Sequence, residues 1–92
     1  MSMMIIQHEV KDYSNWKRVF DLSLPVRKMF GERSSRIFRD MDNPNNISVL
    51  VEWKDIEKAA EYAESEDLRT SMKSAGVIGQ PKIYLLDSEI ES

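Results

Sequence analysis

The order in which hydrophobic patterns follow one another is the strongest constraint on the fold of this chain. Apolar and polar residues alternate in four short segments, whereas apolar residues recur every three to four positions in two longer ones. The first pattern predicts strands and the second predicts helices. The resulting order is strand (3–10), helix (13–30), strand (34–41), strand (47–54), helix (56–75) and strand (80–87).

Capping and turn residues place the ends of these elements. Asp12 and Asp55 precede the helical segments and are expected to act as N-caps, and Ser65 is expected to cap a second part of the later helix, residues 66–75. Pro25 disfavours helical geometry at the residue before it, so the earlier helix should break there. Residues 42–46 are rich in turn formers, which predicts a hairpin between the second and third strands.

The element order β-α-β-β-α-β predicts an α+β, ferredoxin-like sandwich formed by a single domain over residues 1–92. Its four-stranded antiparallel sheet should have the first and third strands in the centre and all helices on one face. Within this sheet, however, we expect the two central strands, the first and the third, to run parallel, and this expectation determines where the site residues are placed. The open face would expose apolar side chains, which predicts a homodimer with stacked sheets, a dimeric α/β barrel. The apolar residues expected there are Ile5, Leu50, Tyr84 and Leu86, with Ser48, Glu52 and Lys82 between them.

Composition excludes several classes of function. The chain has no cysteine, which excludes disulfides, thiolate nucleophiles and cysteine metal sites. A single histidine cannot build a histidine-rich metal centre, so we expect neither a metal nor a cofactor. The formal charge is −3, which disfavours nucleic-acid binding. We find neither a targeting segment nor an apolar run long enough for a membrane, so a cytoplasmic location is expected.

The histidine is expected to face a tryptophan between the sheet and the first helix. His8 lies two residues before the end of its strand, roughly 7 Å from that end at about 3.3 Å per residue. Trp16 lies four residues into the following helix, roughly 6 Å at about 1.5 Å per residue. The two side chains can therefore meet at matching depth. A titratable imidazole beside aromatic rings is suited to holding and polarising a planar organic ligand.

Three further aromatic residues are expected near this pair. With parallel central strands, Trp53 would lie at the same end of the sheet as His8, while Tyr13 would lie at the mouth and Phe20 on the floor. The resulting hypothesis is a cavity that His8, Trp16 and Trp53 line together. The alternative is structural: a core histidine satisfied by hydrogen bonds, with aromatic residues that simply fill the interior.

Arg39 is the remaining candidate ligand-binding residue. Alternation in the second strand puts it on the same face as Ser35, Ile37 and Met41, and we expect this face to point towards the helices. A shift of one residue in the hairpin would reverse that orientation. The alternative is a solvated arginine on an edge strand, because arginine is rarely buried without a partner.

The chain resembles the small dimeric α/β-barrel proteins of the antibiotic-biosynthesis monooxygenase type, which include members labelled as cyclases. The resemblance implies a ferredoxin-like protomer, a face-to-face dimer and a cavity between sheet and helices. It rests on the motifs His8-x-Val10-x-Asp12-Tyr13-x-x-Trp16-Lys17, Arg39-Asp40, Asp42-Asn43-Pro44-Asn45, Glu52-Trp53 and Ala75-Gly76-Val77-x-Gly79-x-Pro81.

That resemblance also implies candidate activities. Cofactor-free oxygenases of this type convert phenolic polycycles to quinones; here His8 would be the base, and Tyr13 or Arg39 would help to hold the oxyanion. The haem-degrading branch uses a histidine on the second helix, and residues 56–75 contain none.

The sequence thus leaves three functions open. The first is a cofactor-independent monooxygenase, isomerase or cyclase that acts on a small aromatic or polyketide-like substrate. The second is a non-catalytic, regulatory module that binds a small planar ligand in the same pocket, because fold resemblance does not carry function. The third is a purely structural dimerisation domain.

Overall fold

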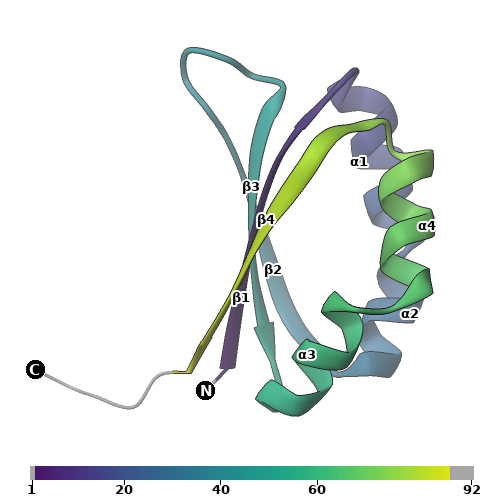
Figure 1. Cartoon of the computed structure of the whole chain (residues 1–92), viewed down its shortest axis with the longest axis vertical. Helices are drawn as coiled ribbons and strands as arrows, with labels where there is room; N and C mark the ends of the chain where they lie inside the picture. Colours follow the sequence, from purple (N-terminus) through teal and green to yellow (C-terminus); the bar gives the residue numbers. More distant parts are fainter. Residues whose placement is uncertain (1, 88–92) are drawn as a thin grey trace, which may run out of the picture.

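The computed structural model describes residues 2–87 and has a four-stranded sheet covered on one face by helices (Figure 1). The predicted α+β, ferredoxin-like fold is confirmed. The elements are β1 (Ser2–Val10), α1 (Tyr13–Leu22), α2 (Leu24–Phe30), β2 (Glu32–Arg39), β3 (Asn46–Trp53), α3 (Ile56–Ala63), α4 (Glu66–Ser74) and β4 (Val77–Asp87).

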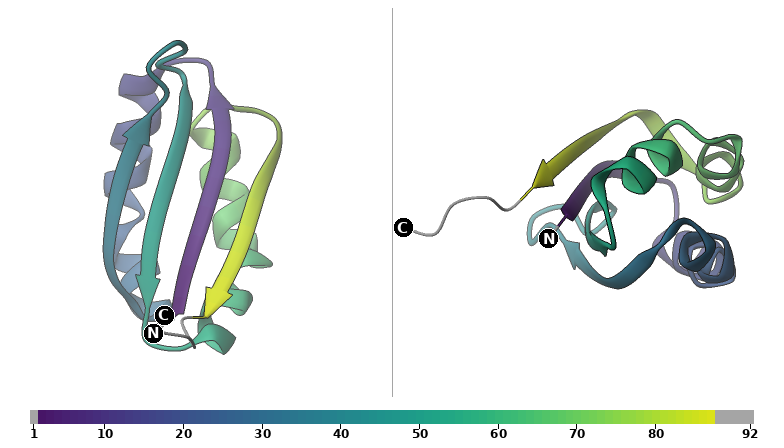
Figure 2. Two further views of the ribbon diagram at one scale, coloured as in Figure 1. Left: turned by 90° about the vertical axis from the view of Figure 1, so that its left-hand side faces the viewer. Right: turned by 90° about the horizontal axis from the view of Figure 1, so that it is seen from below.

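The strand order is β2-β3-β1-β4, so β1 and β3 are central as predicted (Figure 2). Every neighbouring pair is antiparallel, including β1 with β3. The expectation that these two strands run parallel is therefore wrong. The helical crossover returns the chain so that β2 runs in the direction of β1, and the tight hairpin then reverses it for β3.

The predicted helix boundaries follow from local chemistry. The first helical segment is divided into α1 and α2 immediately before Pro25, which stands at the start of α2 where its missing N–H costs no hydrogen bond. The Asp12 carboxylate accepts a hydrogen bond from the Ser14 amide at 3.2 Å. The Ser65 hydroxyl accepts one from the Leu68 amide at 3.1 Å, and so separates α3 from α4.

Two glycines let strands follow helices with almost no loop. Gly31 ends α2 with φ 105°, and Gly76 follows α4 with φ 76°. A left-handed residue turns the chain out of the helix in one step. For this reason β2 and β4 begin two and three residues earlier than the sequence pattern alone predicts.

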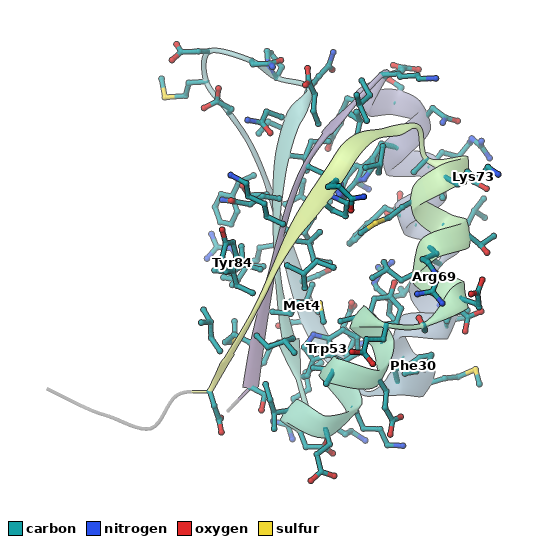
Figure 3. All side chains as sticks on the ribbon, viewed as in Figure 1. Met4, Phe30, Trp53, Arg69, Lys73 and Tyr84 are labelled. Carbon is teal, nitrogen blue, oxygen red and sulfur yellow. The ribbon has the colours of Figure 1, made fainter. Side chains whose placement is uncertain are left out.

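The core lies between the sheet and the helices. Met4 of β1 and Trp53 of β3 point into this layer, whereas Tyr84 of β4 points to the opposite, open side (Figure 3). The α1/α2 pair and the α3/α4 pair lie side by side over the sheet (Figure 2). On the open face, Tyr84 and Leu86 are each 47% exposed, so the expected apolar surface is present.

Replacement of Gly76 by alanine should destabilise the protein by about 1–2 kcal/mol, because an L-residue is strained in the left-handed region. An added Cβ would lie 3.7 Å from the Lys11 Cβ, an ordinary contact, so the cost is one of backbone conformation. Urea denaturation measures the change in the free energy of unfolding. The matched control is Ser74→Ala at the exposed end of α4, which should stay within about 0.5 kcal/mol of the parent. Equal stabilities of the two variants would contradict the argument.

Candidate functional site

The predicted contact between His8 and Trp16 is present. Their ring centroids are 5.8 Å apart, and the rings meet edge to face at 69°. Both side chains are buried, at 7% and 3% exposure. His8 comes from the helix-facing side of β1 and Trp16 from the second turn of α1, so the strand alternation and the helix spacing together produce this pairing.

Trp16 belongs to a column of stacked aromatic rings on one face of α1. Tyr13 stacks on Trp16 with centroids 5.8 Å apart, and Phe20 stacks on its other side at 5.0 Å. A guanidinium group closes each end of the column. Arg39 lies 3.7 Å from the centre of the Tyr13 ring, and Arg27 lies 3.7 Å from that of Phe20. Such cation–π contacts fix the orientation of the rings.

A cavity of about 40 Å³ lies between this column and the sheet. Its wall is largely apolar, and both His8 and Trp16 line it. A water molecule needs roughly 10–15 Å³ by this measure, whereas an apolar cavity that binds benzene has about 150 Å³. The cavity therefore has room for a few waters, and it must widen to admit an aromatic ring. Its polar lining residues are His8, Ser23, Arg27, Tyr62 and Ser71.

The imidazole of His8 lies apart from the polar groups of the described part of the chain. Neither Nδ1 nor Nε2 has a partner among the protein groups of residues 2–87, so no protein hydrogen bond of the kind that the structural alternative requires holds His8. Desolvation by burial lowers the pKa of His8 to about 4. At pH 7 the ring is neutral and carries one N–H donor and one lone pair, and neither has a protein partner among the described residues.

The sheet is irregular beside His8. The register of β1 against β4 shifts between Gln7 and Glu9, so residues 79–81 of β4 lie opposite His8 alone. Gly79, with φ 72°, permits this bulge. A shallow hollow of about 620 Å³ lies over the same region on the open face, and His8 contributes to both this hollow and the inner cavity. Bulges of this kind re-aim side chains next to functional sites.

A buried ion pair forms the far end of the cavity wall. The Nε of Arg27 donates to the Glu32 carboxylate at 2.6 Å, and its Nη1 donates to the Phe20 carbonyl at 2.7 Å. Arg27 and Glu32 are only 3% and 4% exposed. Burial raises the pKa of the neighbouring Tyr62 to about 12, against the opposing effect of the Arg27 charge, so the Tyr62 phenol stays protonated.

Sequence reasoning did not identify Arg27, Glu32 or Tyr62 as site residues. One signal for Arg27 was available, because it falls in the helical series of apolar residues that includes Trp16 and Phe20. A charged residue in an apolar series indicates a buried partner or a ligand. No comparable signal marked Glu32, which lies at the start of its strand.

Trp53 does not join His8, which corrects the predicted arrangement. In the antiparallel register His8 pairs with Ile47 and Trp53 pairs with Ser2, so the two lie about 20 Å apart along the strands. Trp53 packs against Tyr62 with centroids 5.2 Å apart near α3 and Phe30 (Figure 3). It is not among the residues that line the cavity.

Arg39 lies on the expected side of the sheet but outside the cavity. It pairs with Ile47, whose side chain is buried under the helices. Its own side chain is exposed, and Nε donates to the Pro44 carbonyl at 2.9 Å. With the half-buried Tyr13, Arg39 forms the outer end of the aromatic column rather than part of the cavity wall.

A groove on the helical side approaches the cavity from solvent. It has a volume of about 550 Å³ and lies between α1/α2 and α4. Val19, Ser23 and Ser71 line both the groove and the cavity. These three small or medium side chains therefore separate the cavity from the groove.

Residues 2–87 contain neither a metal-binding cluster of side chains nor a helix of membrane-spanning character. No group of three or more histidine and acidic side chains there is arranged to hold a metal ion. No helix in the same range is long and apolar enough to cross a membrane.

Replacement of His8 by leucine should stabilise the protein by about 1 kcal/mol at pH 7, because it removes two buried polar atoms that have no partner. It should also reduce acid sensitivity. The unfolded state of the parent takes up a proton near pH 6.5 and the folded state only near pH 4, so the parent loses stability as the pH falls. Between pH 7 and pH 5 this loss is about 2 kcal/mol. Urea denaturation at the two pH values measures both effects.

The exposed neighbour Gln7 provides the control. Gln7→Ala should keep the pH dependence of the parent. An equally steep loss of stability in His8→Leu would show that other groups cause it.

Comparison with known proteins gives a fold but no close relative. No family model matches the sequence, and no curated protein matches it. Solved structures match over nearly the whole chain. An antibiotic biosynthesis monooxygenase has a TM-score of 0.72 at 15% identity, covering 98% of this chain and 100% of its own. A protein from Bordetella bronchiseptica, named as a candidate antibiotic biosynthesis monooxygenase, has a TM-score of 0.78 at 13% identity, with 97% of each chain covered.

SnoaB, a cofactor-independent oxygenase from Streptomyces nogalater, has a TM-score of 0.72 at 12% identity, covering 98% of this chain and 94% of its own. Identities this low establish the fold and not the activity. The chain therefore has the ferredoxin-like protomer fold of these solved structures, which is the fold that the resemblance of its sequence motifs implied.

Proposed function

We propose that the protein is a cofactor-independent enzyme that acts on a small planar aromatic or polyketide-like substrate, with His8 as the catalytic base. The observation that carries the proposal is the buried His8 imidazole, which is neutral and has both ring nitrogens without a protein partner beside a cavity walled by Trp16 and Phe20. A buried polar group without a partner costs stability, and ligand binding is one reason to retain it.

In the proposed reaction, the free nitrogen of His8 accepts a proton from an acidic hydroxyl or activated C–H group of the substrate. The products of this step are an imidazolium and a substrate anion in contact. Their attraction is strong in an apolar site, which offsets the low basicity of the empty-site imidazole. The stacked rings of Trp16 and Phe20 would hold the substrate plane next to His8.

The anion then has two outcomes. In an isomerase or cyclase, the proton returns at another atom of the substrate. In a monooxygenase, the anion itself reduces dioxygen: a ring CH₂ becomes a carbonyl, and the second oxygen atom leaves as water. SnoaB, which shares the fold, is named a cofactor-independent oxygenase, and this supports the monooxygenase form of the proposal.

A non-catalytic binding role is the second candidate. The observation that favours it is the pKa of about 4 for His8, which makes the empty-site imidazole a weak base. Under this alternative the neutral ring only donates and accepts hydrogen bonds with the ligand. Arg39 and Tyr13, at the outer end of the aromatic column, would contact the part of a ligand that projects from the cavity in either case.

We also propose that two copies associate through the open sheet face. The support is its exposed apolar surface, where Ile5 pairs with Leu50 on one side and Tyr84 on the other. Contiguous apolar side chains on an exposed sheet face are unfavourable in water. Stacking a second sheet on it would add buried apolar surface to the limited core that a domain of this size can form.

Replacement of His8 by alanine should lower turnover by about 10²–10⁴-fold if it is the base, while ligand affinity falls only modestly. Oxygen uptake with a panel of hydroxylated aromatic compounds measures turnover, and quenching of the combined fluorescence of Trp16 and Trp53 measures binding. The parent should keep its kcat/KM down to about pH 5, because the pKa of free His8 is about 4. Gln7→Ala is the control with parent activity. Unchanged turnover in His8→Ala would leave only the binding role.

Replacement of both Tyr84 and Leu86 by lysine should convert the dimer to a monomer, because charges on the open face would be buried without partners. Light scattering after size-exclusion chromatography gives the mass. Met29→Lys is the matched control, since Met29 is apolar and 84% exposed but lies on α2, away from this face. A monomeric parent, or a dimer that survives the double substitution, would exclude the open face as the interface.

A further inference from the structure

The proposed chemistry at His8 leaves one buried charge of the cavity unused. Arg27 lines the same cavity as His8, and each is more than nine-tenths buried. Trp16 and Phe20 lie between them, since Trp16 touches His8 and Phe20 lies under the guanidinium. The cavity thus has a neutral imidazole at one end, a guanidinium at the other and flat aromatic rings along the side.

The guanidinium has donors that its protein contacts do not use. A guanidinium carries five N–H groups. Nε donates to Glu32 and one N–H of Nη1 donates to the Phe20 carbonyl. A third N–H donates to the Tyr62 hydroxyl, which leaves two N–H groups without a protein contact on a side chain that lines the cavity. These contacts also fix the plane of the group, which lies over the Phe20 ring at 3.7 Å, so the donors are held in place before a ligand arrives.

The charge of Glu32 decides which acceptor fits. The ion pair of Arg27 with Glu32 has no net charge, and the carboxylate lies 2.6 Å from the guanidinium. A ligand carboxylate at the free N–H groups would be repelled by Glu32 in an apolar site, whereas a neutral carbonyl oxygen would gain hydrogen bonds without that repulsion.

We propose that Arg27 is a specificity-determining residue that binds a neutral carbonyl-type oxygen on the side of the ligand remote from His8. The ligand is then a planar compound with an acidic hydroxyl at one end and an uncharged acceptor at the other. Glu32 is a positioning residue, which orients Arg27 and excludes carboxylates from the site. This inference rests on the proposed use of the cavity as a ligand site, and it specifies which ligands that site prefers.

Three phenols of similar size differ in the group opposite the hydroxyl, and so they separate the effect of a hydrogen-bond acceptor from the effect of its charge. 4-Hydroxybenzaldehyde has the neutral acceptor, 4-methylphenol lacks it, and 4-hydroxybenzoate replaces it with a carboxylate. Dissociation constants come from two-dimensional ¹H–¹⁵N NMR titrations that follow the indole signal of Trp16. The unmodified protein should bind 4-hydroxybenzaldehyde about tenfold more tightly than either of the others, as expected for a hydrogen bond from a charged donor.

Two variants test the assignment, and the first of them leaves no unpaired buried charge. Arg27→Met combined with Glu32→Leu removes both partners and should keep the fold, while the preference of 4-hydroxybenzaldehyde over 4-methylphenol falls to about one. Glu32→Gln keeps a hydrogen-bond acceptor for Arg27 but frees its positive charge. This variant should bind 4-hydroxybenzoate about tenfold more tightly than the parent, a change of selectivity that a purely structural role of the pair would not produce.

The outcomes separate the two proposals. If the phenols shift the Trp16 signal but bind with equal affinity, or if both variants keep the selectivity of the parent, the assignment of Arg27 fails and the cavity remains the ligand site. If none of the three phenols shifts the Trp16 signal, the cavity does not accept planar phenols, and the proposed function fails together with the inference.

Discussion

The alternation of side chains along the central strand β1 is the constraint on which the rest of the structure depends. Met4, Ile6 and Val10 face the helices because the strand period is two, and His8 is in phase with them. A register in which these apolar residues are buried therefore buries the histidine as well. Its depth, its low pKa and its contact with Trp16 all follow from this position between the sheet and α1.

The first helix supplies the opposite wall by the same kind of geometry. Tyr13, Trp16 and Phe20 lie on one face because a helix repeats every 3.6 residues. Pro25 then ends the regular hydrogen bonding and starts α2. The new helix brings Arg27 back over Phe20, where Glu32 from the next strand neutralises it. The aromatic wall and the charged end of the cavity thus come from one continuous segment of chain.

The periodicity of hydrophobic residues, together with capping and turn residues, was sufficient to predict the element order, the break at Pro25 and the pairing of His8 with Trp16. Each of these three features depends on residues that are close in sequence. Strand direction depends on the whole path of the chain, and the wrong direction for β3 moved Trp53 to the wrong end of the sheet. The Arg27–Glu32 pair was missed for a related reason. Its two residues meet across the left-handed Gly31, which shortens the connection between helix and strand beyond what the hydrophobic pattern indicates.

The layer around the cavity is fixed at its two ends and is weakest between them. Where α1 begins and α4 ends, the Asn15 side chain donates to the Ser74 carbonyl at 3.1 Å. At the other end, the buried pair of Arg27 and Glu32 joins α2 to β2. Between these points only Val19, Ser23 and Ser71 separate the cavity from the outer groove. Under the proposed function, entry of a ring-sized ligand between α1/α2 and α4 would disturb the fewest of these contacts and would leave the sheet and His8 in place.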